Sequence, residues 1–219
     1  MERAYTSNSS NLSHIKEAPD NPMELFQKFI NIMREENDSS TITMSLATIN
    51  KEFGVLNRTV LFRGLSKRSG NITFVTERNS QKYKDLQENP KVSVVLLFLK
   101  EINGKLQYRQ IRVHGSAIEL SEDEIAERWK EEPVFARIRS KMASCGAPVK
   151  WDVLKEKHDQ LLEAYKNGEE PLNQSETYTS FEIIADSIDF YYAEHEAIGD
   201  RVIYRRHEND IWTHEHVFA

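Results

Sequence analysis

The chain has 219 residues, of which 39% are hydrophobic, and this is enough for one domain with a substantial core. Its formal net charge of −6, with basic and acidic residues interspersed, argues against nucleic acid as a partner. The single cysteine, Cys145, excludes an intramolecular disulfide and any metal site built from several cysteines.

The sequence contains no recognisable targeting segment or membrane span. Its N-terminus lacks the apolar stretch of a signal peptide, and no apolar run is long enough to cross a bilayer. We therefore expect a soluble, cytoplasmic protein with no membrane partner. Residues 1–18 are polar and rich in Ser and Asn, which predicts a flexible N-terminal arm, followed by a single domain over residues 19–219.

The first predicted elements are a helix and a series of strands. Asn21-Pro22 is typical of a helix start, and apolar residues then recur at helical spacing to about Asn37. From Thr41 to Thr48 the alternation is that of a strand, and turn signals then separate further runs rich in β-branched and aromatic residues. These strands are predicted over residues 55–62, 72–76, 91–100 and 106–120. Short glycine-containing turns, such as Ser69-Gly70-Asn71, predict antiparallel pairing of neighbouring strands.

The remaining predicted elements are three helices and four C-terminal strands. Helices are expected over residues 80–89, 122–131 and 150–165, and the Gly- and Pro-containing stretch between the last two is expected to be irregular. Strands are expected over residues 179–184, 187–192, 200–205 and 211–216. This order predicts a mainly β fold, an antiparallel, Greek-key-like barrel that carries peripheral helices.

The stretch from Arg58 to Lys82 predicts a phosphate site. An apolar strand with a cation at each end, Arg58 and Arg63, is followed by a second strand and the helix start Ser80-Gln81-Lys82. Guanidinium, ammonium, hydroxyl and backbone N–H groups of this kind can surround one anion. Each arginine, taken alone, is more often a charge in contact with solvent. Their spacing puts them on opposite faces of a regular strand, so both can bind one ligand only if the strand bends or the ligand is extended.

These residues resemble the flavin-binding core of the pyridoxamine 5'-phosphate oxidase family, an FMN-binding split β-barrel. The run Arg58-Thr-Val-Leu-Phe-Arg63-Gly is similar to the family's Arg-x-Val-Leu-Leu-Lys-Gly. Val75-Thr76 and Ser80-Gln81-Lys82 are similar to its Tyr-Thr pair and its Ser-Arg-Lys triplet. The residues thereby implied to bind FMN are Arg58, Thr59, Val60, Leu61, Arg63, Val75, Thr76, Ser80, Gln81 and Lys82. Because Gln81 carries no charge, phosphate affinity would depend more on the cations.

Three later residues complete the flavin site that the resemblance implies. Arg109-Gln110-Ile-Arg-Val-His-Gly115 is similar to a family strand whose glutamine contacts the flavin of a neighbouring subunit, so Gln110 is implied and a homodimer is expected. Tyr191 stands where the family has a flavin-packing tryptophan. Arg201, in Asp200-Arg201-Val-Ile-Tyr204, matches an arginine that also contacts the flavin.

The resemblance is weakest where the substrate should bind. The family's Arg-Leu-His, which contacts pyridoxal phosphate, is replaced by Ala197-Ile198-Gly199, and Glu132 puts a negative charge where a phosphate dianion needs a positive one. Arg63 and Arg128 remain as candidate substrate-binding residues. We assign no catalytic acid or base and no metal site, because His214 and His216, two apart on a predicted strand, are more typical of a surface pair.

Three functions are compatible with these residues. The favoured one is an FMN-dependent oxidoreductase that takes hydride from a small molecule other than the vitamin B6 phosphates and passes electrons to oxygen. The second is a genuine pyridoxamine/pyridoxine 5'-phosphate oxidase of vitamin B6 metabolism, which would use Arg63 and Arg128 as phosphate ligands. The third is a non-catalytic flavin- or ligand-binding protein.

Overall fold

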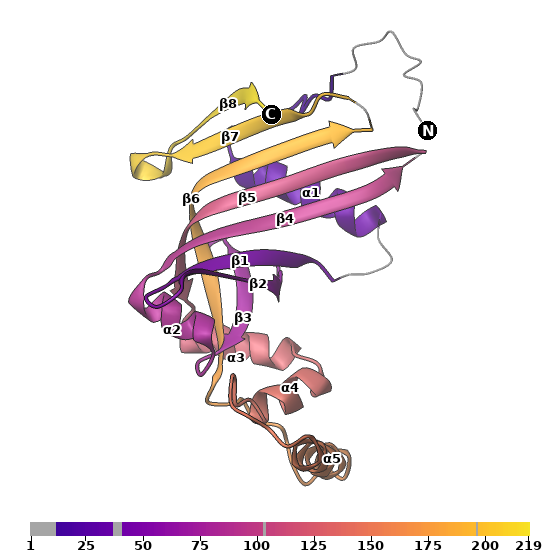
Figure 1. Ribbon diagram of the computed structural model, residues 1–219, viewed down its shortest axis with the longest axis vertical. Helices are drawn as coiled ribbons and strands as arrows, with labels where there is room; N and C mark the ends of the chain where they lie inside the picture. Colours follow the sequence, from indigo (N-terminus) through magenta and orange to yellow (C-terminus); the bar gives the residue numbers. More distant parts are fainter. Residues whose placement is uncertain (1–11, 37–40, 103, 196) are drawn as a thin grey trace. The chain divides into compact units, whose positions relative to one another are not determined.

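The computed structural model of the protein describes residues 12–36, 41–102, 104–195 and 197–219. In these ranges the helices are α1 (Pro22–Glu36), α2 (Gln81–Glu88), α3 (Glu122–Glu131), α4 (Val134–Lys141) and α5 (Trp151–Lys166) (Figure 1). The strands are β1 (Thr43–Asn50), β2 (Gly54–Leu61), β3 (Ile72–Glu77), β4 (Lys91–Ile102), β5 (Lys105–Glu119), β6 (Tyr178–Glu194), β7 (Asp200–Arg206) and β8 (Trp212–Phe218). A short 3-10 helix, Glu208–Asp210, joins β7 to β8.

The strands pair in the order β2-β1-β4-β5-β6-β7-β8, and β3 pairs with β6 away from this path. The pairs β3–β6, β6–β7 and β7–β8 are antiparallel, so that Tyr191 lies opposite Arg201 and Tyr204 lies opposite His214. These pairings confirm the prediction of a mainly antiparallel β fold with helices. Within the described part of the chain, no helix combines the length and apolarity needed to cross a membrane.

The chain folds into two compact units, each assembled from several segments. The first contains the chain up to Ser45 together with Ser93–Gly115 and Ala185–Ala219, and the second contains Leu46–Val92 and Ser116–Ile184. Strands β1, β4, β5 and β6 contribute residues to both units. The single domain over residues 19–219 stays a prediction.

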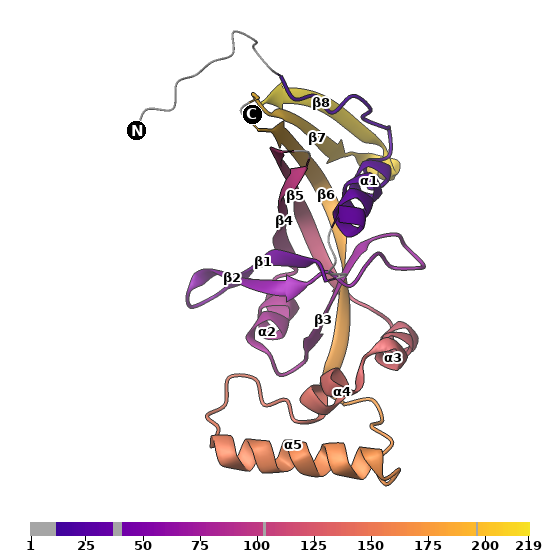
Figure 2. The same cartoon turned by 90° about the vertical axis from the view of Figure 1, so that its right-hand side faces the viewer.

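In the first unit, α1 packs its apolar face on β6 and β7 (Figure 2). Asn21 accepts a hydrogen bond from the backbone N–H of Met23 at 2.9 Å and so caps the helix, as expected from the sequence. The Phe29 ring meets Phe190 edge-on, with 5.4 Å between ring centres, and Phe190 meets Tyr204 in the same way at 5.6 Å. These buried aromatic contacts fix α1 against the strands.

In the second unit, α3 closes an apolar cluster. Its capping box, formed by Ser121 and Glu124, confirms the predicted helix start. Ile125 and Trp129 of α3 pack with Leu120 and Tyr178, and the indole N–H of Trp129 is hydrogen-bonded to a backbone carbonyl. Burial of this cluster holds α3 on the end of β6.

Two predictions about secondary structure are wrong. The region expected to be irregular after residue 131 contains α4, because Pro133 lies just before the first helical residue, where a proline is tolerated. The two strands expected over residues 179–184 and 187–192 are one strand, β6. This strand runs without a break through the polar Asp186. Its first part pairs with β3, and its part from Ser187 onward pairs with β7.

The predicted antiparallel pairing across the Ser69-Gly70-Asn71 turn is confirmed in part. The Arg63 N–H donates to the Thr73 carbonyl at 2.9 Å, the Thr73 N–H donates to the Gly64 carbonyl at 3.0 Å, and Leu65 and Ile72 form an antiparallel bridge. The regular strand β3 pairs along its length with β6. Of the predicted N-terminal arm, residues 1–11 lie outside the described residues, and Leu12 forms a bridge with Ile198.

Candidate functional site

Cationic and hydroxyl side chains gather at the start of α2 in the second unit. Ser80 caps this helix by accepting the backbone N–H of Tyr83, and its hydroxyl lies 2.9 Å from that of Thr76. The Lys82 ammonium group donates to the Thr76 hydroxyl at 3.1 Å. The structure therefore brings Thr76, Ser80 and Lys82 together at a helix N-terminus, where the partial positive charge favours an anion.

The buried carboxylate of Asp85 holds the other polar members of the predicted phosphate site. The Arg58 guanidinium lies 3.4 Å from Asp85 and also donates to the Thr48 hydroxyl at 2.6 Å. Gln81 donates to Asp85 at 2.9 Å, and Thr48 and Asn50 both donate to it at 2.7 Å. Asp85 thus accepts hydrogen bonds from four side chains, and Arg58 is the cationic one among them.

Arg58 and Lys82 are two cations in this cluster, with the carboxylates of Asp85 and Glu77 near them. Burial lowers the pKa of Lys82 and the nearby charge of Arg58 lowers it further, against smaller opposing effects of acidic neighbours. Burial also lowers the pKa of Arg58, and Asp85 compensates only in part. A bound anion would offset the repulsion between the two cations.

The other predicted residues of the second unit lie on β2 and β3. Thr59, Val60 and Leu61 form the end of β2, where Thr59 and Leu61 are exposed. Val75 packs against the apolar cluster of α3. Arg63 follows the end of β2, and the structure therefore places it beyond the regular strand on which Arg58 lies.

A groove of about 990 Å³ borders the Lys82 cluster. Glu77 and Cys145, which line it, are close enough to Lys82 to influence its pKa. Its other walls are mainly apolar and come from α4, α5 and the segment between them, a composition and size typical of small-molecule sites. The apolar residues that line it are Phe135, Met142, Ala143, Pro148, Val149, Trp151, Val153 and Leu154.

Sequence reasoning missed this groove because α4 was predicted as irregular chain. A signal for the groove was present in the sequence. Large apolar residues, including Phe135 and Trp151, stand on both sides of the stretch that contains glycine and proline. Their exposed fractions are 68% and 72%, which is high for side chains of this size.

Arg63 and Arg128, the predicted substrate-binding residues, meet at a second place in the same unit. Arg63 forms a salt bridge with Glu132, whose side chain is only 4% exposed. The Tyr178 hydroxyl donates to the same carboxylate at 3.0 Å, and burial together with the Glu132 charge raises the pKa of Tyr178, which keeps the phenol protonated. Arg128 donates to the Arg63 carbonyl at 3.2 Å and to the Thr73 hydroxyl at 2.8 Å.

The pocket beside these arginines is close to electrically neutral. It has a volume of about 320 Å³ and is lined by Arg63 and Arg128 together with Lys67 and Arg68. Four acidic side chains, Asp123, Glu124, Glu127 and Glu131, line it as well. Glu132 is also paired with Arg63, so this arginine has no unpaired charge to offer a substrate phosphate.

In the first unit, Arg201 is fixed by the carboxylate of Asp189. Its Nε donates to Oδ1 at 3.1 Å and its Nη2 donates to Oδ2 at 2.6 Å, the paired geometry typical of arginine with carboxylate. Arg112 donates to the same carboxylate. Gln110 lies half-buried on β5 in this unit.

Tyr191, the third predicted residue of the first unit, lies directly over Gly199. A Cβ atom at position 199 would come within 2.6 Å of the Tyr191 hydroxyl oxygen and even closer to its ring. Tyr191 therefore occupies the space that any side chain at position 199 would need. The histidine implied at this position by the family resemblance and the observed Tyr191 ring exclude each other sterically.

Comparisons with known proteins agree with the sequence motifs. Residues 23–120 match the family described as pyridoxamine 5'-phosphate oxidase, FMN-binding domain. A pyridoxine/pyridoxamine 5'-phosphate oxidase of Idiomarina loihiensis is 30% identical over 164 residues, which cover 74% of each chain. One of Legionella pneumophila strain Lens is 26% identical over 204 residues, covering 90% of this chain and 87% of the relative.

Solved structures share the fold. PhzG from Burkholderia lata 383, in complex with tetrahydrophenazine-1-carboxylic acid, superposes with a TM-score of 0.82 at 20% identity and covers 96% of this chain and 100% of its own. A pyridoxamine 5'-phosphate oxidase-related, FMN binding protein from Nostoc punctiforme PCC 73102 has a TM-score of 0.70 at 18% identity. This match covers 94% of the present chain and 100% of the Nostoc chain. These likenesses confirm the predicted FMN-binding split-barrel fold.

The contact between Tyr191 and Gly199 predicts a coupled pair of substitutions. Gly199→Ala is expected to lower the free energy of unfolding by about 1–3 kcal/mol, because the methyl group displaces the Tyr191 ring. In a protein that already carries Tyr191→Ala, Gly199→Ala should lower the free energy of unfolding much less, because the ring is absent. Urea unfolding of the four proteins measures the coupling, and equal costs in both backgrounds would contradict it.

Proposed function

Because the chain belongs to the pyridoxamine 5'-phosphate oxidase family, we propose that it is an FMN-dependent oxidoreductase whose substrate is not a vitamin B6 phosphate. One observation carries this proposal. The Arg58–Lys82 cluster brings two cations and two hydroxyl groups to the start of α2, whereas Arg63 is paired with the buried Glu132. These contacts support a site for the phosphate of FMN beside Lys82, and they argue against a site for a substrate phosphate beside Arg63.

The residues around Lys82 fit the phosphate group of FMN. Arg58 and Lys82 would supply charge, and Thr76 and Ser80 would supply hydroxyl groups at the start of α2. FMN, when bound, would accept a hydride from a reduced substrate and pass the electrons to oxygen. The apolar groove beside Lys82 offers a weakly hydrated surface for an aromatic ring.

Gln110, Tyr191 and Arg201, which the family resemblance also implies as flavin contacts, lie in the first unit. Gln110 and Arg201 would orient the flavin by hydrogen bonding, and Tyr191 would offer it an aromatic face. Asp189 holds the Arg201 guanidinium in one orientation, which lowers the entropy lost when a ligand binds. No side chain of this set is assigned as an acid or a base.

The altered pocket supports a substrate other than pyridoxamine or pyridoxine phosphate. Ala197 and Gly199 replace the two polar groups with which the family pattern contacts the substrate, and Glu132 repels a dianion. PhzG, which has the same fold, was solved with a ring carboxylic acid, so this fold admits ligands without a phosphate group. A genuine pyridoxamine phosphate oxidase is the second candidate, because Arg63 and Arg128 line one pocket.

We further propose that the chain works as a homodimer. Leu97 and Leu99 of β4 are 54% and 56% exposed, so this strand presents apolar surface that a second copy would cover. Light scattering of the purified protein should therefore give the mass of two chains. The mass of one chain at micromolar concentration would contradict the dimer.

The cofactor assignment predicts a loss of FMN binding in two variants. Arg58→Ala and Lys82→Ala should each weaken FMN binding at least tenfold, because each removes a charged phosphate ligand. Lys84→Ala is the matched control, because Lys84 is an exposed lysine on the same helix. Fluorescence titration with FMN measures the affinities, and circular dichroism checks the fold. Unchanged affinity in both variants would overturn the assignment.

The substrate assignment predicts slow turnover of pyridoxamine 5'-phosphate. The flavin-loaded protein should form little peroxide or aldehyde, whereas Glu132→Gln should lower the KM for this substrate because it frees the Arg63 charge. Peroxide formation by the unmodified protein at an ordinary enzymatic rate, on the order of 1 s⁻¹ or faster, would show the second candidate instead. An ultraviolet–visible spectrum without bound flavin, even after addition of FMN, would exclude both enzymes.

A further inference from the structure

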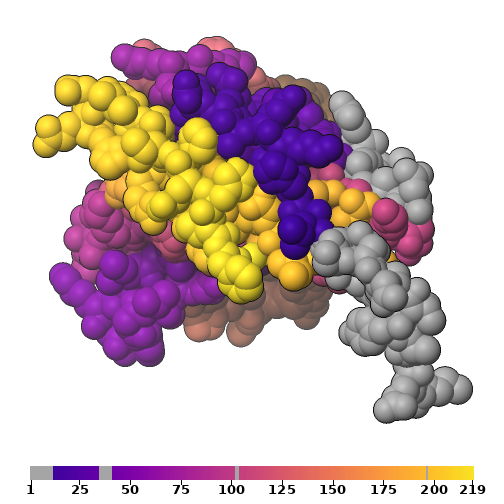
Figure 3. All heavy atoms as spheres, turned by 90° about the horizontal axis from the view of Figure 1, so that it is seen from above, coloured from indigo at the N-terminus to yellow at the C-terminus, as the bar shows by residue number. Residues whose placement is uncertain are grey.

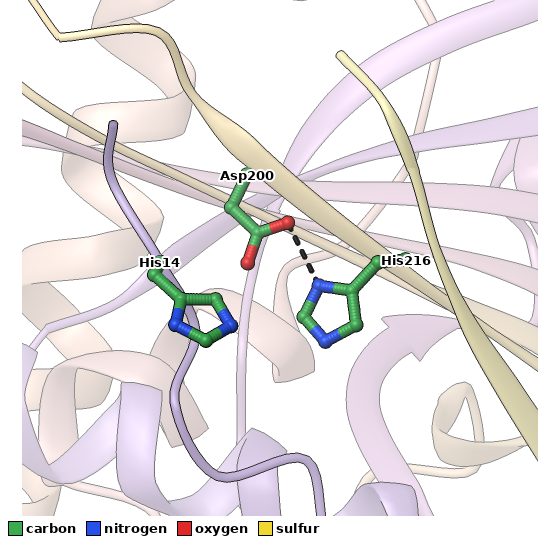
Figure 4. Close-up of side chains that lie close together, drawn as sticks. All are labelled: His14, Asp200 and His216. Carbon is green, nitrogen blue, oxygen red and sulfur yellow. Dashed lines mark hydrogen bonds and ion pairs between the residues drawn. The ribbon is translucent and has the colours of Figure 1, made fainter. Parts of the chain in front are cut away.

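His14, Asp200 and His216 converge in the first unit, outside the flavin site proposed above. They come from three segments of the chain: the residues before α1, the start of β7 and the end of β8 (Figure 4). One potential ligand atom from each lies within 4.8 Å of the other two. The two imidazole rings lie on either side of the Asp200 carboxylate, with 5.4 Å between ring centres.

The carboxylate in this group is held in place by the backbone. Asp200 is 9% exposed, and its Oδ2 accepts the Ile15 N–H at 2.8 Å. Its Oδ1 accepts the Arg201 N–H at 2.8 Å and lies 2.9 Å from Nδ1 of His216. The two backbone N–H donors orient the carboxylate before a metal arrives, as outer hydrogen-bond partners do in known metal sites.

The segment that carries His14 is also fixed. The Ser13 N–H donates to the Ile198 carbonyl at 2.9 Å, and the Ser13 hydroxyl accepts the Glu194 N–H at 2.8 Å. Figure 3 shows the N-terminal residues, in indigo, lying against the yellow C-terminal strands. His14 is therefore kept beside His216, although the two are 202 positions apart in the sequence.

We propose that His14, Asp200 and His216 bind one divalent transition-metal ion of the Zn²⁺ class. Two imidazole nitrogens and one carboxylate oxygen form a ligand set that Zn²⁺ uses together with a water molecule. This set disfavours Mg²⁺ and Ca²⁺, which prefer oxygen ligands alone. A hydrogen bond between Asp200 and His216 explains the position of only one of the two histidines. A metal site explains why His14 lies beside them as well.

Binding requires a small movement of the two histidines. Tetrahedral Zn²⁺ separates its ligand atoms by about 3.4 Å, given bonds of about 2.0–2.1 Å. The present spread of up to 4.8 Å must therefore contract, and the exposed His14 and half-exposed His216 are free to rotate while Asp200 stays fixed. The bound ion would join the segment before α1 to β7 and β8.

Isothermal titration of full-length, untagged protein with Zn²⁺, after removal of metals with a chelator, tests the site. One ion per chain should bind with a Kd of about 1 µM or tighter. His14→Ala and His216→Ala should each weaken binding at least tenfold. His214→Ala is the matched control, because His214 lies on β8 with His216 but outside the group. The Zn²⁺ affinity of this variant should differ less than twofold from that of the unmodified protein.

Two results would overturn the proposal. One is the absence of stoichiometric Zn²⁺ binding to the unmodified protein, and the other is an equal affinity in the three histidine variants. His14→Ala is the decisive variant, because it keeps the hydrogen bond between Asp200 and His216 intact. Circular dichroism of each variant confirms that a loss of binding does not reflect unfolding.

Discussion

The burial of charge is the constraint on which the candidate site depends, because each buried carboxylate decides what the arginine beside it can still bind. Asp85 pairs with Arg58 at 3.4 Å, and Lys82 adds a second cation beside the hydroxyl groups at the start of α2. Glu132 instead pairs directly with Arg63 and also accepts the Tyr178 hydroxyl. The same family scaffold therefore holds one cluster prepared for an anion and one that is already neutralised.

Steric exclusion adds a second restriction to the charge balance. The ring of Tyr191 fills the space above Gly199, so a side chain at position 199 would require this ring to move. A pocket altered in both charge and shape is better explained by a different substrate than by random loss of contacts.

The sequence predicted most of the elements because its local signals were strong. Asn21, Ser80 and Ser121 cap the helices that begin after them, and the alternation in β1 places Met44, Leu46 and Thr48 in the interior. The partner of β3, the continuity of β6 and the presence of α4 depend on contacts between distant segments, which periodicity does not encode. The motif likewise gathered Thr76, Ser80 and Lys82 correctly in space and pointed to the charge of Glu132, but it gave no sign that Asp85 would pair with Arg58.

A comparison of FMN with riboflavin, which lacks the phosphate group, tests the central claim most directly. If the Arg58–Lys82 cluster is the phosphate site, two or more charge-assisted hydrogen bonds worth about 1.5–3 kcal/mol each should be lost with riboflavin. Equilibrium titration of the purified protein should then show FMN binding about a hundredfold more tightly, or more. Equal affinities for the two flavins would contradict the account.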